Sequence, residues 1–332
     1  MSLRILFMVL SLVWAAPTVG QTTLRLATVA PDGSFWMREM RAGAEEIRAR
    51  TEGRVRIQYF PGGVMGNEQA VLRRIRIGQL QGGAFTGGAL APVYRDAALY
   101  TLPFLFRSHD EVDVIRAKFD AELEAGLEQA GFVSFGLAEG GFARLLSGSP
   151  VSGLKDLAGK KVWVPEGDAV AYAAMEALGL TPTTLPLTDV LTGLQTGLIN
   201  IVASPPIGAI AFQWHTRVRY MTDTPLAYTW AQLIIDRRAF NRLTKTDQAI
   251  VTEVMRAVYA RLDGQNRRDN ESATAAMVAR GIELVSPTEE ELRAWHEIGD
   301  RITRNVIDRG TFDAGLYRRV RAALDEYRIA YP

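Results

Sequence analysis

The chain has 332 residues, 48% of them hydrophobic, and its 38 basic and 37 acidic side chains leave a formal net charge of +1. This length suits two domains of ordinary size, and the balanced charge without a basic block argues against nucleic acid as a partner. Cysteine is absent, which excludes disulfides, thiolate metal sites, cysteine catalysis and a lipid-anchored N-terminal cysteine.

Residues 1–20 have the pattern of a secretory signal peptide. Arg4 precedes an apolar run from Ile5 to Ala16, and small residues follow as far as Gly20. We therefore expect export to the periplasm, cleavage near Gly20 and a mature chain that begins near Gln21 without a lipid anchor. A retained interfacial anchor is the alternative.

Strand-like and helix-like segments alternate after the signal. The first block has strands at 24–29, 54–60 and 80–86 and helices at 35–50 and 67–77. A second block has strands at 160–164 and 199–203 and helices at 169–178, 188–196 and 207–216. Such alternation predicts an α/β fold on a largely parallel sheet, and two blocks in succession indicate two lobes.

The last third of the chain contains a long predicted helix, from Thr244 to about Ala279, after an apolar strand at 226–235. Its first half is amphipathic and its second half is polar, which suggests that it crosses from one lobe to the other. Two more amphipathic helices follow. We expect lobe I to comprise residues 21–140 and about 230–264, and lobe II to comprise residues 141–229 and about 265–332.

Conventional catalytic and metal-binding motifs are missing from the sequence. The histidines His109, His215 and His296 are isolated, and the glycine-rich segment 82–88 lacks the spacing of a nucleotide-binding loop. We therefore predict no enzyme activity, no metal and no cofactor. The enzyme alternative depends on scattered acids without a base partner: Glu166, Asp168 and Asp189.

Six stretches, taken in order, resemble the substrate-binding subunit of tripartite ATP-independent periplasmic (TRAP) transporters, of the DctP type. They are residues 27–36, 59–68, 74–80, 102–106, 157–165 and 194–200. The resemblance implies two α/β lobes joined by hinge strands and by a long helix that spans both. It also implies a ligand cleft between the lobes, delivery of the ligand to integral membrane subunits, and no catalysis.

The chain departs from that family at positions that hold a ligand carboxylate. Trp163 stands where an arginine is common, and a second arginine position is occupied by Ala143, with Arg144 one residue later. A shift by one residue turns a strand side chain to the opposite face, so we interpret Arg144 as structural, with anion contact as the alternative. A buried carboxylate without a cation is unfavourable by roughly several kcal/mol. The sequence therefore favours an apolar ligand.

The predicted ligand-binding residues lie within or beside these motifs: Phe35, Trp36, Asn67, Thr86, Gly87, Trp163, Leu187, Ser204, Trp214 and Trp230. For Trp36 and Trp214, burial in a lobe core is the alternative. Ser204 precedes Pro205-Pro206 and is predicted to cap a helix. The amides of that helix start could hold a small polar or anionic head group, or the segment is an ordinary helix start.

We expect a periplasmic receptor for a small apolar or aromatic molecule, or for a monocarboxylate. The segments Val162-Trp163, Gly167-Asp168 and Phe212-Gln213-Trp214 resemble a minority branch of the family. That branch implies a tetratricopeptide-containing partner protein and hydrophobic ligands. The alternatives are a receptor for a conventional organic acid that uses Arg144, and a ligand-dependent periplasmic interaction protein.

Overall fold

The computed structural model describes residues 21–331, so the predicted signal peptide lies outside the described residues. The first lobe contains β1 (Thr22–Thr28), α1 (Phe35–Arg50), β2 (Val55–Phe60), α2 (Glu68–Arg76), β3 (Gly82–Thr86), α3 (His109–Gln129) and β4 (Phe132–Ser134). Two 3₁₀ segments, Gly88–Leu90 and Arg95–Thr101, lie between β3 and α3. Of the helices within residues 21–331, none is both long enough and apolar enough to span a membrane.

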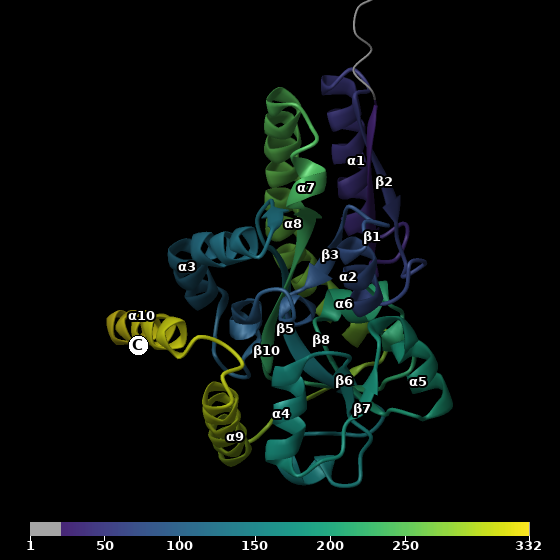
Figure 1. Cartoon of the computed structure of the whole chain (residues 1–332). Helices are drawn as coiled ribbons and strands as arrows, with labels where there is room; N and C mark the ends of the chain where they lie inside the picture. Colours follow the sequence, from purple (N-terminus) through teal and green to yellow (C-terminus); the bar gives the residue numbers. More distant parts are fainter. Residues whose placement is uncertain (1–20, 332) are drawn as a thin grey trace, which may run out of the picture.

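The second lobe contains β6 (Trp163–Pro165), α4 (Ala169–Leu178), β7 (Thr183–Leu185), α5 (Val190–Thr196), β8 (Ile201–Ser204), α6 (Pro206–Ala211) and β9 (Tyr220–Thr222). Short 3₁₀ segments cover Leu154–Leu157, Leu187–Asp189 and Trp214–Thr216. Two long strands join the lobes: β5 (Ala138–Ser147) and β10 (Ala227–Asp236). The chain ends with α7 (Arg237–Phe240), α8 (Lys245–Ala279), β11 (Glu283–Val285), α9 (Glu289–Asp308) and α10 (Ala314–Ala330). The first lobe is the upper part of Figure 1 and the second lobe the lower part.

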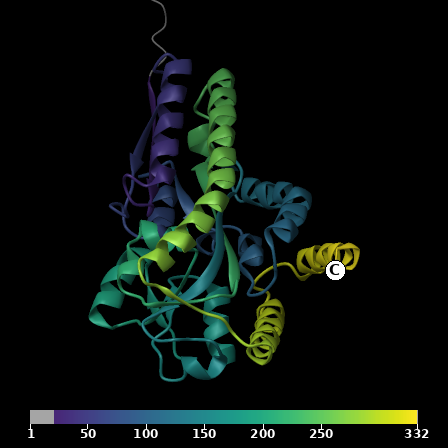
Figure 2. The same cartoon turned by 180° about the vertical axis from the view of Figure 1, so that it is seen from behind.

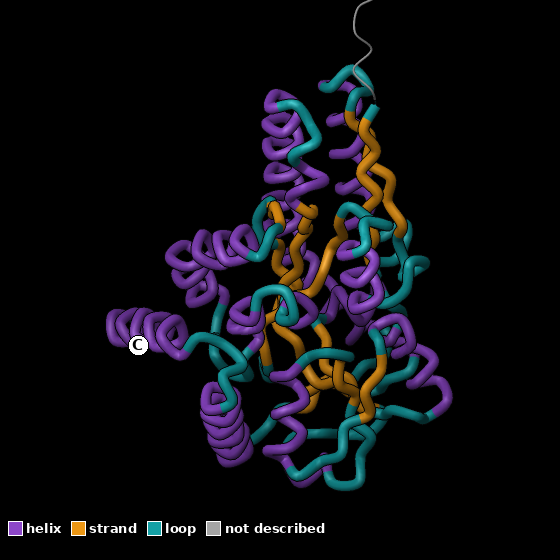
Figure 3. The backbone as a smooth tube through the Cα atoms, in the orientation of Figure 1, coloured by secondary structure: helices purple, strands orange, loops and turns teal. Residues whose placement is uncertain are grey.

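The sheet is mixed and continuous through both lobes. Its order is β11-β9-β5-β10-β3-β1-β2, with β4 paired to β10 and β8 paired to β5, while β6 and β7 form a separate pair. Figure 3 shows the strands in the middle of the molecule with helices around them. The strands β1, β2 and β3 are parallel, as predicted, but β10 runs antiparallel to β3, β4 and β5. The prediction of a largely parallel sheet is therefore wrong where strands cross between lobes.

Two apolar cores cover the two faces of the first-lobe sheet. Adjacent strand residues face opposite sides, so Ala84 and Leu233 belong to the core with α1 and α8. Their neighbours Phe85 and Ile234 belong to the core with α2, α3 and α10. This alternation explains why these strands read as continuous apolar runs: both of their faces are buried.

The strand β5 changes its sheet partners midway along its length. Residues 138–143 pair with β10 in the first lobe, and residues 144–147 pair with β8 in the second lobe. The change falls between Ala143 and Arg144. A strand that belongs to both lobes is the hinge element that the sequence led us to expect.

The long helix α8 has the predicted length, 35 residues or about 52 Å. Its apolar first half packs against α1, and Figure 2 shows the helix running from there toward the second lobe. One face of the polar second half is buried and holds β5, while Arg268, Glu271 and Ser272 on its other side are exposed. Asn266 Nδ2 donates a hydrogen bond to Glu139 O at 2.6 Å, and Asn270 Nδ2 donates one to Gly140 O at 2.8 Å.

The C-terminal helices contact different lobes. The helix α9 packs against α4 of the second lobe, whereas α10 packs against α3 of the first lobe. Leu316 and Val320 of α10 share a core with Val112 and Ile115 of α3. The predicted residue ranges of the two lobes stay a prediction. The sequence analysis assigned residues 265–332 to lobe II, whereas α10, which belongs to that range, packs on α3 of the first lobe.

Candidate ligand-binding cleft

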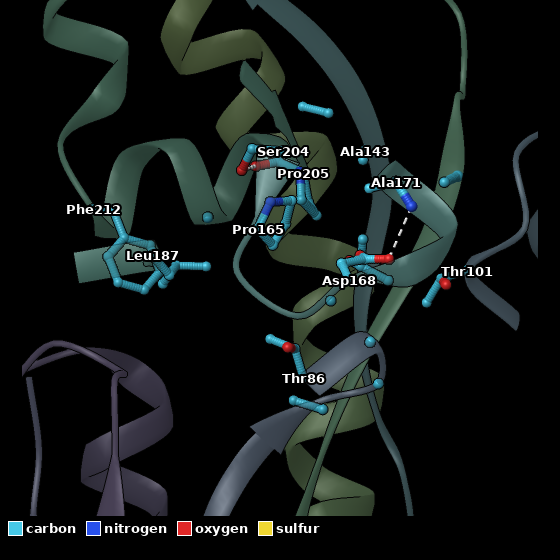
Figure 4. Close-up of a pocket in the computed structure, with 18 of the residues that line it drawn as sticks. Thr86, Thr101, Ala143, Pro165, Asp168, Ala171, Leu187, Ser204, Pro205 and Phe212 are labelled. Atoms are coloured by element: carbon cyan, nitrogen blue, oxygen red, sulfur yellow. Dashed lines mark hydrogen bonds between the residues drawn. The ribbon is translucent and has the colours of Figure 1, made fainter. Parts of the chain in front are cut away.

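A cavity of about 770 Å³ lies between the two lobes. Both lobes and the crossing strands line it, chiefly through residues 28–36, 84–89, 162–166, 203–205, 210–214 and 229–231, with Ala143 and Leu145 of β5. Figure 4 shows Thr86 of the first lobe on one side, with Pro165, Asp168 and Pro205 of the second lobe on the other. This volume and mainly apolar lining are typical of a small-molecule site.

Nine of the ten predicted ligand-binding residues line this cavity: Phe35, Trp36, Thr86, Gly87, Trp163, Leu187, Ser204, Trp214 and Trp230. Asn67 does not. Its Oδ1 caps α2 by accepting from Ala70 N at 2.8 Å, and its Nδ2 donates to Glu166 Oε2 of the second lobe at 2.5 Å. Asn67 thus links the two lobes at the rim instead of lining the cavity.

Arg144 also lies outside the cavity lining. Its guanidinium is paired with the carboxylate of Asp223, while the preceding residue, Ala143, lines the cavity. This arrangement is the one expected when neighbouring residues of a strand face opposite ways. To reach a ligand, Arg144 would have to leave Asp223 and turn through the sheet.

Trp163 belongs both to the cavity wall and to the second-lobe core. Only 5% of the residue is exposed, and its Nε1 donates to Leu185 O at 2.9 Å. Its ring meets that of Trp214 edge-on, with centroids 5.3 Å apart. Trp214 is 2% exposed and also lines the cavity. Both tryptophans are therefore buried in the second-lobe core and also form part of the cavity wall, so the two interpretations are compatible.

The start of α6 differs from the sequence prediction. Pro205, not Ser204, is the N-cap, and the Ser204 hydroxyl donates instead to Pro205 O at 2.9 Å. The amide of Ile207 donates to Asn270 Oδ1 of α8 at 3.1 Å. The prediction that Ser204 caps this helix is wrong, since its hydroxyl donates to the carbonyl of the next residue and accepts from no amide of the helix. Because the Ile207 amide already donates to Asn270, fewer amides at this helix start are free to bind an anionic head group.

Two carboxyl groups of the cavity were not predicted as ligand-binding residues. Glu68 Oε1 accepts from the Thr86 amide at 2.7 Å and from its hydroxyl at 3.1 Å. Asp168 caps α4, accepting from Ala171 N at 2.9 Å. Burial, and then the charge of Asp168, raise the pKa of Glu68 to about 7. Burial also raises the pKa of Asp168 above its ordinary value.

The sequence held only weak signals for these two acids. Glu68 stood inside the motif Gly66-Asn67-Glu68, and Asp168 was one of three scattered acids. They are a hundred residues apart, and the packing of the two lobes against each other places both in the lining of one cavity.

The charge of the cavity lining has one sign. Its ionisable residues are Asp32, Glu68, Glu166 and Asp168, and among the described residues that line it there is no lysine, arginine or histidine. Within residues 21–331 no three histidine, cysteine, aspartate or glutamate side chains gather in a way that could hold a metal ion. The volume of the cavity and its mainly apolar lining suit the binding of a small molecule.

Comparison with known proteins supports a receptor. Residues 26–309 match the family described as bacterial extracellular solute-binding protein, family 7 (DctP). The C4-dicarboxylate-binding periplasmic protein DctP of Rhodobacter capsulatus is 23% identical over 258 residues, 76% of this chain and 77% of the relative. The 2,3-diketo-L-gulonate-binding periplasmic protein YiaO of Escherichia coli K12 is 26% identical over 254 residues, 72% of this chain and 74% of the relative.

Solved structures share the two-lobed fold. A TRAP periplasmic solute binding protein from Sulfurospirillum deleyianum with bound succinate has a TM-score of 0.83 at 20% identity, covering 92% of this chain and 99% of that one. The sugar acid binding protein DctPAm from Advenella mimigardefordensis, in complex with galactonate, has a TM-score of 0.85 at 18% identity with the same coverage. Such proteins are solute receptors and not enzymes. The chain belongs to the DctP family of bacterial extracellular solute-binding proteins and is a receptor of the TRAP type.

Proposed function

We propose that this receptor binds a small, largely apolar or aromatic molecule between its lobes and delivers it to the integral membrane subunits of a TRAP transporter. The observation that carries the proposal is the cavity lining, in which aromatic and aliphatic side chains predominate and the described residues include no basic one. A ligand can contact both lobes at once only when the lobes are closed. Its binding therefore stabilises the closed state.

The electrostatics of the lining argue against an anionic ligand. A ligand carboxylate would meet four carboxyl groups and no cation, at a desolvation penalty on the order of several kcal/mol. Relatives described as binding succinate, galactonate or C4-dicarboxylates accept organic acids. For this chain, the alternative of an organic acid held by Arg144 requires the loss of the pair with Asp223. The lining thus favours the apolar ligand over the monocarboxylate.

Location and partners complete the proposal. Residues 1–20 would direct export and be removed near Gly20, leaving a periplasmic receptor that has no cysteine for lipid attachment. The resemblance of the segments around Trp163 and Trp214 to one branch of the family supports a tetratricopeptide-containing partner. Capture of such a protein together with the receptor from periplasmic extract tests the partner separately from the ligand.

Native mass spectrometry and thermal shift against a ligand panel test the proposed ligand class. The panel contains apolar and aromatic molecules of up to about 770 Å³, together with C4-dicarboxylates and sugar acids. Apolar members should raise the melting temperature, and acids should not. Strong stabilisation by succinate without any effect of apolar members would reject the proposed ligand class, although the chain would remain a TRAP receptor.

A further inference from the structure

The carboxyl groups of Glu68 and Asp168 reach the same part of the cavity from opposite lobes. Glu68, in the first turn of α2, is bound to Thr86. Asp168, before α4, lies so close to Gly88 that a methyl group there would come within 2.9 Å of its Oδ2. Both acids therefore converge on the short segment from Thr86 to Gly88, and Figure 4 shows Thr86 and Asp168 on facing sides of the cavity.

No basic side chain balances this pair from the cavity side. The other ionisable residues of the described lining are Asp32 and Glu166, and Glu166 already accepts from Asn67. Burial raises the pKa of both Glu68 and Asp168, while hydrogen bonds from backbone amides to each carboxyl group oppose the rise. A cation between the two carboxyl groups would favour their ionised forms.

Trp230 gives a second, independent sign of a ligand at this place. It is only 1% exposed and lines the cavity, yet its Nε1 donates no hydrogen bond within residues 21–331. A methyl group at Gly87 would come within 2.6 Å of that nitrogen, so the N–H lies beside the same segment. Buried indole N–H groups normally find an acceptor, and a ligand oxygen would supply one here.

We infer that the ligand is a small organic cation, a protonated amine on an apolar or aromatic body, whose ammonium group binds between Glu68 and Asp168. A neighbouring acceptor atom of the ligand takes the Trp230 N–H. An ammonium group donates three hydrogen bonds and has no acceptor, which matches two carboxyl groups and no base. The apolar body occupies the lining formed by residues such as Trp163 and Leu187. This inference rests on the proposed receptor function and specifies its ligand.

A matched set of probes separates charge from shape. 3-Amino-2-benzylpropanamide carries a primary amine that is protonated at pH 8 and a carbonyl oxygen, 2-benzylpropanamide lacks only the amine, and 2-benzylpropionate carries a carboxylate in place of the amide. The set is repeated with larger aliphatic and aromatic bodies, and affinities are measured by calorimetry at pH 8 on the mature chain. We expect each amine to bind at least roughly tenfold more tightly than its desamino partner, and the carboxylates to bind least.

Variants assign the effect to the two carboxyl groups. Glu68→Gln and Asp168→Asn should each weaken binding of the amine by roughly tenfold or more and change binding of the desamino amide less than about twofold. Glu166→Gln is the control, since it removes a lining carboxylate that Asn67 already bonds. Thermal unfolding monitored by circular dichroism confirms that each variant is folded before its affinity is compared.

The outcomes separate this inference from the proposed function. If desamino amides bind as tightly as amines, the cation inference fails while an apolar ligand remains. If only carboxylates bind, both fail. An amine preference that Glu68→Gln and Asp168→Asn leave unchanged would also overturn the inference, because the charge would then be held elsewhere.

Discussion

Replacement of Glu68 by glutamine should change how the stability of the ligand-free receptor depends on pH. Burial, together with the charge of Asp168, raises the pKa of Glu68 from 4.5 to about 7. Between pH 4.5 and pH 7, Glu68 is deprotonated in the unfolded chain but still protonated in the folded protein. The contribution of Glu68 to the stability of the wild type therefore falls as the pH rises from 4.5 to 7 and no longer changes above 7. Glutamine removes this dependence and keeps an acceptor for the Thr86 amide.

The magnitude follows from the size of that rise. From 4.5 to about 7, at roughly 1.36 kcal/mol per pH unit, the upper limit is about 3.4 kcal/mol. Because Glu68 opens into a solvated cavity, we expect a smaller value. The wild type should lose about 1–2 kcal/mol more stability than Glu68→Gln between pH 5 and pH 8.

Urea unfolding followed by circular dichroism at pH 5 and pH 8 measures the effect. Glu111 provides a control, because its pKa is shifted in the opposite direction. Burial alone would raise the pKa of Glu111, but hydrogen bonds from Arg328 and from the Arg107 amide lower it below its ordinary value. Its pH dependence therefore lies below pH 4.5, where stability is lost as the pH falls, and Glu111→Gln should lower stability equally at pH 5 and pH 8. Parallel stability curves for the wild type and Glu68→Gln would refute the reasoning.

Four further substitutions, at three positions, test the packing and the lobe contact. Trp163→Ala should lower stability by about 3–5 kcal/mol in urea unfolding, whereas Trp163→Phe, which keeps a ring against Trp214, should lower it by about 1–2 kcal/mol. Asn270→Ala should lower it by about 2–3 kcal/mol, since backbone groups of β5 and α6 lose their partner. Gly88→Ala should push Asp168 away and hold the lobes apart, seen as a larger radius of gyration in X-ray scattering.

Local features of the sequence placed the helices well. The predicted bounds of α4 agree with the structure because Asp168 caps its start and Gly179, with φ of 66°, ends it. The long helix α8 also has the predicted extent, since its amphipathic pattern and the Thr244 cap are local. The fold class followed from the alternation of elements and from the family resemblance.

Strand direction and the ionisable part of the cavity could not be predicted in this way. A strand buried on both faces has the same apolar run whether it is parallel or antiparallel, so β10 gave no sign of its direction. Trp163 looked like a cleft residue from its place in a motif, but its partner Trp214 lies about fifty residues away. Glu68 and Asp168 meet only through the arrangement of the two lobes, which no local pattern records.

The change of partners along β5 determines which ligand contacts sense the position of the lobes. Ala143 lies beside the point where β5 changes its pairing from β10 to β8, which is where we expect the axis of a lobe rotation. Contacts at Ala143 therefore change little on opening. Leu187 and Phe212 lie on the side of the cavity away from Ala143 in Figure 4, where a small rotation becomes a large displacement. A ligand that contacts Leu187 and Phe212 therefore binds the closed receptor more tightly than the open one and stabilises closure. A ligand that contacts only the residues beside Ala143 binds both states with almost equal affinity.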